Sequence, residues 1–293
     1  MDRRAFLTNT ALTAAAISSY GMMACNRLKS EDKLFLLRYD TEWWGEENEM
    51  EGFFEKLIEV HRANSIPATF FCTGNTLTNR TEVFRAFYNE VKHDALFDFQ
   101  DHSFNHIGLC KKEGQGLTFE ELKSDYEKSF SIHNEVFEKM PVGISLCGTP
   151  GESYKAFDVN EKTKAEFEML ANLGMKMINT YLLELDGSKE FCNYSSLGHP
   201  EIMGFPSGYS DTDWGWKNKE TKGPAYILDE IKMRSGNNEH MPLMLHDWVA
   251  WQHAEDKELT HVKMFADQAR KYNYKLVTHI ECYQDKRIWK TTT

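Results

Sequence analysis

Strand-like and helix-like segments alternate through this sequence, and that rhythm constrains the fold more than any other feature. Short apolar runs predict strands at residues 34–39, 68–72, 96–99, 142–147, 177–181, 202–205, 243–246 and 276–280. Apolar residues recur at helical spacing in 50–63, 81–91, 118–137, 164–173, 225–233 and 259–270. A capping box from Thr118 to Glu121 predicts where the helix at 118–137 begins. Such alternation is typical of an α/β domain built on a parallel sheet.

No break in composition divides the chain after residue 33, so residues 34–293 are predicted to form one domain. Its length of about 260 residues fits a (β/α) barrel better than an open sheet, although alternation alone does not separate the two. In either fold, functional residues gather at the carboxyl ends of the strands. The net charge of −11 argues against a nucleic-acid partner.

The first 24 residues have the composition of an export signal. Arg3 and Arg4 precede a small, apolar and uncharged stretch at 11–24, which is too short to remain as a membrane-spanning helix. The arginine pair resembles a twin-arginine signal, and the residues ending at Cys25 resemble a lipoprotein processing box. The alternative is an ordinary cleaved signal with an incidental cysteine.

We therefore expect residues 1–24 to be removed, Cys25 to carry lipid, and residues 25–33 to form a tether. The mature protein would be an exported, membrane-anchored lipoprotein of the periplasm or cell surface. It would contact the membrane through Cys25 only.

Residues suited to metal binding and proton transfer follow several predicted strands. They are Asp40, Glu42, His102, His106, Asp211, Asp213, His246 and Asp247. Neutral imidazole and carboxylate are common ligands of divalent metals. With 11 histidines in 293 residues, a histidine pair at one given spacing is weak evidence by itself. The position of the histidine pair at a predicted strand end, beside the other polar residues, strengthens the case for a metal site.

Three stretches that contain these residues resemble motifs of the polysaccharide deacetylase family, the carbohydrate esterases with a NodB-homology domain. The three stretches follow one another in the same order as the family's motifs. They are Tyr39-Asp40-Thr41-Glu42, His102-Ser103-Phe104-Asn105-His106 and Leu243-Met244-Leu245-His246-Asp247. The resemblance covers about residues 34–285, and the acidic stretch is the loosest match. It implies a distorted, TIM-like (β/α) barrel of about seven or eight strands.

The resemblance also implies a role for each matching residue. Glu42, His102 and His106 would bind a divalent metal, with zinc as the expected ion. Asp40 would be the catalytic base and His246 the general acid, oriented by Asp213 or by Asp211. The Gly151 N–H would bind the oxyanion, and the tryptophans beside the motifs would stack on sugar rings, foremost Trp43, Trp214 and Trp248.

One position departs from the family pattern. Gly148 stands where an arginine usually orients the catalytic base; Arg38 shares a strand face with Asp40 and is the candidate replacement. The expected function is metal-dependent removal of acetyl groups, N-acetyl first, from a cell-wall or extracellular polysaccharide or oligosaccharide.

The missing arginine leaves open a second interpretation, a non-catalytic glycan-binding protein on the same barrel. A third, an iron-dependent oxygenase with the same ligand triad, is disfavoured because that fold is usually all-β.

Overall fold

The computed structural model describes residues 26–28, 31–42, 47–107, 118–147, 164–179, 190–206, 209–211, 223–253 and 255–289. The predicted export signal and Cys25 lie outside the described residues, as do Trp43, Gly148, Gly151, Asp213 and Trp214. Part of the predicted tether is ordered into strand β1 (Asn26–Leu28), which pairs antiparallel with β7 (Phe191–Tyr194). A strand at this place was not predicted.

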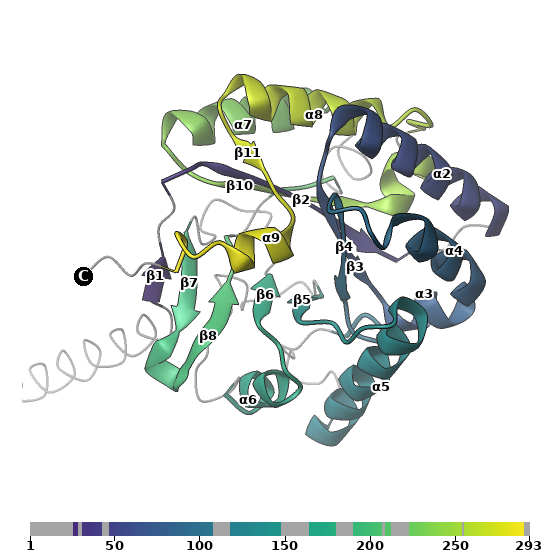
Figure 1. Ribbon diagram of the computed structural model, residues 1–293, viewed down its shortest axis with the longest axis vertical. Coiled ribbons are helices and arrows are strands. Elements are labelled where there is room, and N and C mark those ends of the chain that lie inside the picture. Colours follow the sequence, from purple (N-terminus) through teal and green to yellow (C-terminus); the bar gives the residue numbers. More distant parts are fainter. Residues whose placement is uncertain are drawn as a thin grey trace, which may run out of the picture.

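A parallel sheet forms the centre of the molecule (Figure 1). Its parallel strands, in spatial order, are β9 (Tyr209–Ser210), β10 (Met241–His246), β2 (Leu34–Thr41), β3 (Ala68–Cys72), β4 (Phe97–Asp101), β5 (Gly143–Ser145), β6 (Met177–Asn179) and β8 (His199–Gly204). The antiparallel strands β7 and β1 extend the β8 edge. The predicted α/β class with a parallel sheet is confirmed. Among the described residues, the edge strands β1 and β9 do not pair with each other, so a closed barrel stays a prediction.

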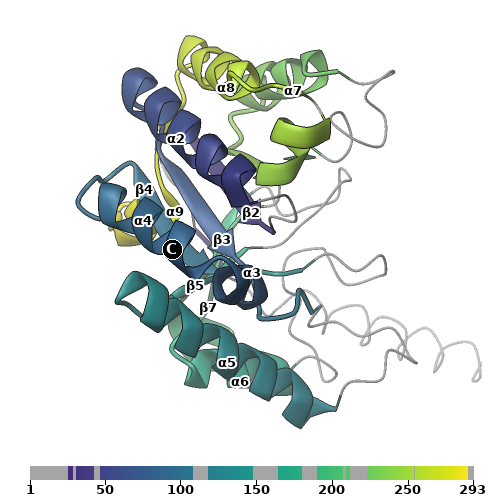
Figure 2. The same ribbon diagram turned by 90° about the vertical axis from the view of Figure 1, so that its right-hand side faces the viewer.

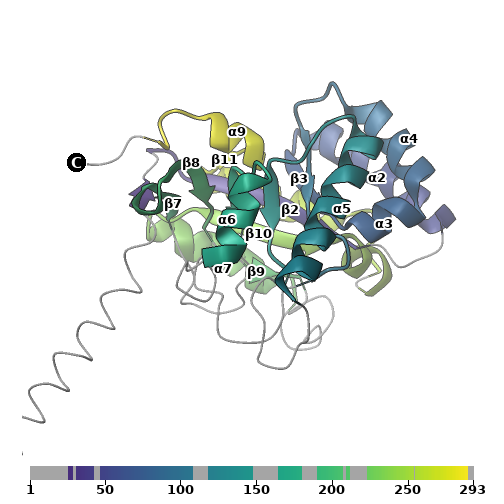
Figure 3. The ribbon, with the colours of Figure 1, turned by 90° about the horizontal axis from the view of Figure 1, so that it is seen from below.

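Helices cover the outside of this sheet (Figures 1 and 2). They are α2 (Glu47–Asn64), α3 (Gly74–Asn79), α4 (Thr81–Val91), α5 (Phe119–Phe137), α6 (Lys164–Asn172), α7 (Ala225–Gly236) and α8 (Thr260–Lys271). Figure 3 shows α2 to α5 gathered at one end of the molecule, with β7 and β8 at the other. Helix α5 begins at the predicted capping box, because Thr118 Oγ1 accepts the Glu121 N–H at 3.2 Å. In the part of the chain described here, every helix is too short or too polar to cross a membrane.

Strand β2 is buried on both faces, and its two faces enter different clusters. Phe35, Leu37 and Tyr39 join the large cluster beneath the helices α2, α4 and α8. Leu34 and Leu36 point the other way and pack in a second cluster inside the sheet. Because side chains alternate along a strand, Arg38 and Asp40 continue that inner face towards the carboxyl end. The interior therefore changes from apolar to polar along β2.

The last predicted strand, at 276–280, is confirmed only at its start. The short strand β11 (Lys275–Leu276) pairs parallel with β2, and helix α9 (His279–Gln284) begins three residues later, where the sequence predicted more strand. The side chain of Thr278 caps this helix by accepting the Glu281 N–H at 3.1 Å. This local cap outweighs the strand preference of the β-branched residues around it.

Candidate metal and acid–base site

Two acidic residues mark the carboxyl end of β2. Asp40 and Glu42 are 3% and 4% exposed, although both carry a carboxylate. Asp40 is the register partner of His246 in the neighbouring strand β10. Pairing in register therefore brings the predicted base and the predicted acid to the same edge of the sheet.

The two motif histidines reach Glu42 from a tight turn that follows β4. Ser103 and His106 have φ values of 60° and 56°, which is uncommon for residues other than glycine. The turn carries His106 back beside His102, with ring centroids 4.9 Å apart. Left-handed backbone at these two residues, and not a helical turn, brings the two imidazoles together.

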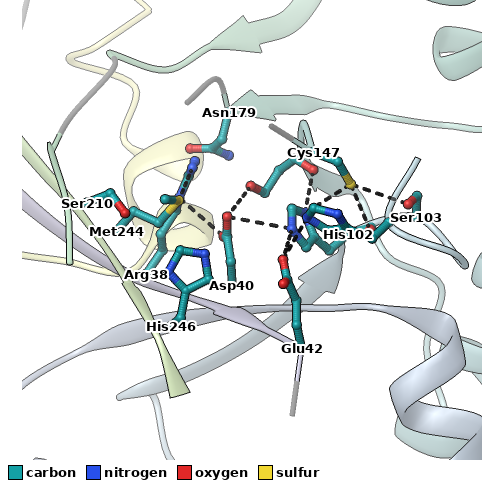
Figure 4. A network of polar contacts seen from close by, with 12 residues as sticks. Arg38, Asp40, Glu42, His102, Ser103, Cys147, Asn179, Ser210, Met244 and His246 are labelled. Carbon is teal, nitrogen blue, oxygen red and sulfur yellow. Dashed lines mark hydrogen bonds and ion pairs between the residues drawn. The ribbon is translucent and has the colours of Figure 1, made fainter. Parts of the chain in front are cut away.

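One oxygen of the Glu42 carboxylate contacts both imidazole rings, and Figure 4 shows its contact with His102. Glu42 Oε1 lies 2.9 Å from His102 Nε2 and 2.8 Å from His106 Nε2. His102 Nδ1 lies 2.8 Å from the Ser145 carbonyl oxygen. Because that oxygen can only accept, Nδ1 carries the proton and Nε2 is left to bind a metal. Two imidazole nitrogens and one carboxylate oxygen form a donor set that suits zinc and similar cations.

Cys147 was not predicted as part of this site. With His102 and His106 it forms a group that could hold a metal ion. Its Sγ lies 3.7 Å from His102 Nδ1, the nitrogen already bonded to Ser145, whereas Glu42 faces Nε2. Burial also raises the pKa of the Cys147 thiol. In the orientation that the structure shows, His102 turns Nε2 towards Glu42. Glu42, and not Cys147, therefore completes the donor set with the two histidines.

The Glu42 carboxyl is held in its ionised form. Burial acts to raise its pKa, but hydrogen bonds with His102 and His106 outweigh burial and lower the pKa below its usual range. Asp247 anchors the backbone here, since its Oδ1 accepts the N–H groups of Glu42 at 3.4 Å and Trp248 at 2.9 Å. It thereby ties the end of β2 to the end of β10.

Asp40 lies between a cation and the histidine turn (Figure 4). Arg38 Nε is 3.4 Å from Asp40 Oδ1, and both side chains are buried. The Ser145 hydroxyl donates to Asp40 Oδ2 at 3.2 Å, and His102 Nε2 lies 3.6 Å from the same oxygen. Strand parity predicted the contact with Arg38, and the role of Ser145 was missed.

Within the described part of the chain, His246 is hydrogen-bonded to the buried carboxylate of Asp211. Asp211 Oδ1 accepts from His246 Nδ1 at 2.7 Å, and Asp211 Oδ2 accepts the His246 backbone N–H at 2.6 Å. Burial lowers the pKa of His246, but the charge and hydrogen bond of Asp211 raise it to about 9. The imidazole is therefore protonated at neutral pH. Of the two residues predicted to orient His246, Asp211 contacts it, and Asp213 lies outside the described residues.

Helix α5 holds the histidine turn from behind. Its residues Asp125, Ser129 and His133 follow one another at helical spacing on one face. Asp125 Oδ1 accepts the Phe104 N–H at 2.8 Å, and its Oδ2 accepts from the Asn105 amide at 2.7 Å. None of the three was singled out from the sequence, where they read as polar positions of an amphipathic helix.

The same face of α5 also contacts the carboxyl ends of strands β3 and β4. Ser129 donates to Asp101, the last residue of β4, and His133 Nε2 lies 3.0 Å from the Cys72 carbonyl oxygen at the end of β3. One helix therefore fixes the ends of two strands together with the turn that carries His102 and His106.

Trp248 does not have the open surface that sugar stacking needs. It is 5% exposed, and its ring packs 5.5 Å from His246 and 5.3 Å from His253, measured between centroids. The predicted stacking role is corrected for this tryptophan, since its faces are used inside the protein. It packs against His246 instead.

Solved structures with the same fold carry related descriptions, although no family model and no curated protein matches the sequence. A polysaccharide deacetylase from Mycobacterium smegmatis, described as putative, superimposes with a TM-score of 0.61 at 12% identity, over 90% of this chain and 96% of that one. Bacillus subtilis PdaA, a family 4 carbohydrate esterase, gives 0.54 at 14% identity, over 94% and 90%.

A CE4 family pseudoenzyme from Bacillus anthracis gives a TM-score of 0.55 at 11% identity, over 89% of this chain and 68% of that one. At these identities the likeness shows the fold, which is the one shared by the CE4 deacetylase structures.

Proposed function

We propose that this protein is a metal-dependent hydrolase that removes acetyl groups, N-acetyl first, from a cell-wall or extracellular polysaccharide. One observation carries the proposal. A buried, arginine-paired carboxylate and a protonated histidine lie in register on β2 and β10, beside two imidazoles that converge on Glu42. A base, an acid and a site for a divalent metal are groups that can together hydrolyse an amide. The shared fold of the CE4 structures supports the same reaction class.

Each residue has a definable task in this reaction. A divalent cation held by Glu42, His102 and His106 would polarise the acetyl carbonyl and acidify a bound water. Asp40 would take the proton of the attacking water, and Arg38 would keep that carboxylate oriented. His246 would give its proton to the departing amine.

The charge states of Asp40 and His246 allow one to accept a proton and the other to donate one. The Asp211 carboxylate raises the pKa of His246 to about 9, so His246 is protonated at neutral pH and can act as the acid. After amine release, the proton that Asp40 took from water can restore His246. Water and amide are consumed, and acetate and amine are formed.

The glycan-binding alternative was motivated by Gly148. Arg38 lies beside Asp40 and supplies a cation from the same strand, which favours the catalytic function over the binding function. Sugar binding alone would not need a carboxylate base on β2 and a protonated histidine beside it on β10.

Acetate release tests the proposal. Protein reconstituted with zinc is incubated with chitin oligomers, peptidoglycan or acetylated xylan, and free acetate is measured. Asp40→Asn and His246→Ala are each expected to lose about 10²–10⁴-fold in rate while they still bind metal. Fully metal-loaded wild type that releases no acetate, yet binds a glycan, would establish the binding protein instead.

A further inference from the structure

The short strand β5 carries a residue that contacts both halves of the candidate site. Ser145, the last residue of this strand, is fully buried. Its hydroxyl donates to Asp40 Oδ2 at 3.2 Å, and its carbonyl oxygen lies 2.8 Å from His102 Nδ1. One residue therefore contacts the proposed base through its side chain and a proposed metal ligand through its backbone. It lies outside the three motifs that resemble those of the deacetylase family.

The hydroxyl acts on one particular oxygen of the Asp40 carboxylate. Oδ1 faces Arg38 Nε at 3.4 Å, whereas Oδ2 lies 3.6 Å from His102 Nε2, the nitrogen that contacts Glu42. Oδ2 is therefore the oxygen on the side of the metal donor set, where it is placed to take the proton of the attacking water. With Arg38 on one oxygen and Ser145 on the other, the carboxylate cannot rotate without losing a contact.

The carbonyl group acts on the metal ligand. Because a carbonyl oxygen can only accept, it keeps the proton of His102 on Nδ1 and leaves the lone pair of Nε2 directed towards Glu42. A shift of Ser145 would therefore change the orientation of the His102 ring and that of the Asp40 carboxylate together.

A side chain of β4 sets the position of β5. In the described part of the chain these two strands share a single register pair, Asp101 with Ile144. Gln100 Oε1 instead accepts the N–H groups of Val142 at 2.9 Å and Gly143 at 2.7 Å. The glycine leaves room for this amide, since a Cβ at position 143 would lie 3.1 Å from Oε1. Gln100 therefore takes the place of strand pairing where β5 begins.

We propose that Ser145 is a positioning residue of the hydrolysis described above. Its hydroxyl turns Oδ2 of Asp40 towards the attacking water, and its carbonyl group orients the His102 ring for metal binding. Gln100 acts through Ser145 by setting the position of β5. The inference rests on the proposed hydrolase function and adds the residues that hold its base and a metal ligand in one geometry.

The variant Ser145→Ala separates the two contacts, because it removes the hydroxyl and keeps the carbonyl group. The kcat of acetate release is expected to fall about tenfold or more, the effect of one hydrogen bond to a charged group. KM and the zinc dissociation constant should stay at their wild-type values. Ser145→Thr, which restores a hydroxyl, should regain most of the lost rate. An unchanged kcat in Ser145→Ala would overturn the role of the hydroxyl.

Thr69→Val is the matched control for this variant. It removes another buried strand hydroxyl that donates to a buried carboxylate, that of Asp98 at 3.4 Å, away from the metal donor set. This control is expected to keep the wild-type kcat. A loss as large as that of Ser145→Ala would show a general effect of removing buried hydroxyls and would overturn the specific role of Ser145.

The variant Gln100→Met tests the backbone contact. It removes the acceptor of two N–H groups, so β5 should shift and zinc affinity should fall together with the rate, by about tenfold or more. Chelator competition measures this affinity, and an unchanged value would overturn the part of Gln100. Nitrogen-15 NMR of the zinc-loaded wild type should show the proton of His102 on Nδ1. A proton on Nε2 would overturn the role of the carbonyl group.

A double-mutant cycle keeps the inference independent of turnover. Ser145→Ala should lower the free energy of unfolding in urea by more in the wild type than in Asp40→Ala, where the acceptor is missing. Equal losses in the two proteins would overturn the contact with Asp40 even if acetate is released. Unequal losses in a protein that never releases acetate would leave this contact standing and overturn the proposed hydrolase alone.

Discussion

Arg38 and Asp40 are alternate residues of strand β2, and their side chains form a buried ion pair with 3.4 Å between Nε and Oδ1 (Figure 4). Arg38 also donates from Nη2 to the Met244 sulfur at 3.0 Å and lies over the Phe71 ring, 5.7 Å from its centroid. Three neighbouring strands thereby hold the guanidinium. The candidate base is oriented from within its own strand and does not depend on an arginine at position 148.

Replacing Arg38 is expected to impair both turnover and stability. In Arg38→Met the Asp40 carboxylate stays buried without its cation, which destabilises a fold by about 3–5 kcal/mol. The acetate-release rate should fall by about 10²-fold, while zinc binding persists. The matched double variant Arg38→Met/Asp40→Asn should recover part of the lost stability, measured by urea unfolding. Additive losses in this cycle would contradict the ion pair.

The alkaline limb of the pH profile should report His246. Its pKa is raised to about 9, so the acid form dominates below that pH, and kcat/KM should fall as the pH rises through about 9. Asp211→Asn removes the charge that raises this pKa, and burial then lowers it. The limb should therefore move to lower pH in that variant. A limb at the same pH in both proteins would assign it to another group.

Metal content should separate ligands from proton-transfer residues. His106→Ala removes one of the two nitrogens at Glu42 and is expected to bind well below one zinc per chain. Asp40→Asn should keep its zinc, and so should His93→Ala, which removes an exposed histidine outside the site. Elemental analysis of the dialysed proteins gives the answer. A fully loaded His106→Ala would rule out this donor set.

Helix α5 is expected to control metal affinity without contacting the metal. Asp125→Ala removes the acceptor of the Phe104 and Asn105 N–H groups, so the turn carrying His106 should lose its fixed shape. Residues that orient metal ligands typically contribute 10- to 100-fold to affinity, and a chelator competition should show a loss of about that size. Glu127→Gln, on the exposed face of the same helix, is the control. Equal affinities in the two variants would remove Asp125 from the site.

Membrane attachment tests the proposal for Cys25. If Cys25 carries lipid, the wild type should fractionate with membranes and incorporate a labelled fatty acid. Cys25→Ser should then appear in the soluble fraction. Identical fractionation of the two proteins would contradict the lipoprotein proposal.

Features governed by short-range geometry could be predicted from the sequence. The alternation of strands and helices, the capping box at Thr118, and the shared face of Arg38 and Asp40 all depend on residues a few positions apart. Strand and helix periods place such residues without knowledge of the rest of the chain. The donor set followed from spacing together with the family resemblance.

Some local features could not be predicted, because their conformation has no sequence signal. The turn after β4 needs left-handed backbone at Ser103 and His106, a conformation that is uncommon outside glycine. Asp125 supports it by accepting the N–H groups of Phe104 and Asn105 between them. The end of the 276–280 segment was misassigned because its strand-like composition was outweighed by a single helix cap at Thr278.

The sequence by itself determined the α/β class and the residues able to carry the chemistry, because both follow from side-chain type and period along the chain. Only the tertiary structure decided which of them meet. The register of β10 on β2 sets His246 opposite Asp40, and the same packing selects Asp211 as its partner. These pairings join segments far apart in sequence, so they depend on how the whole sheet packs and not on any local preference.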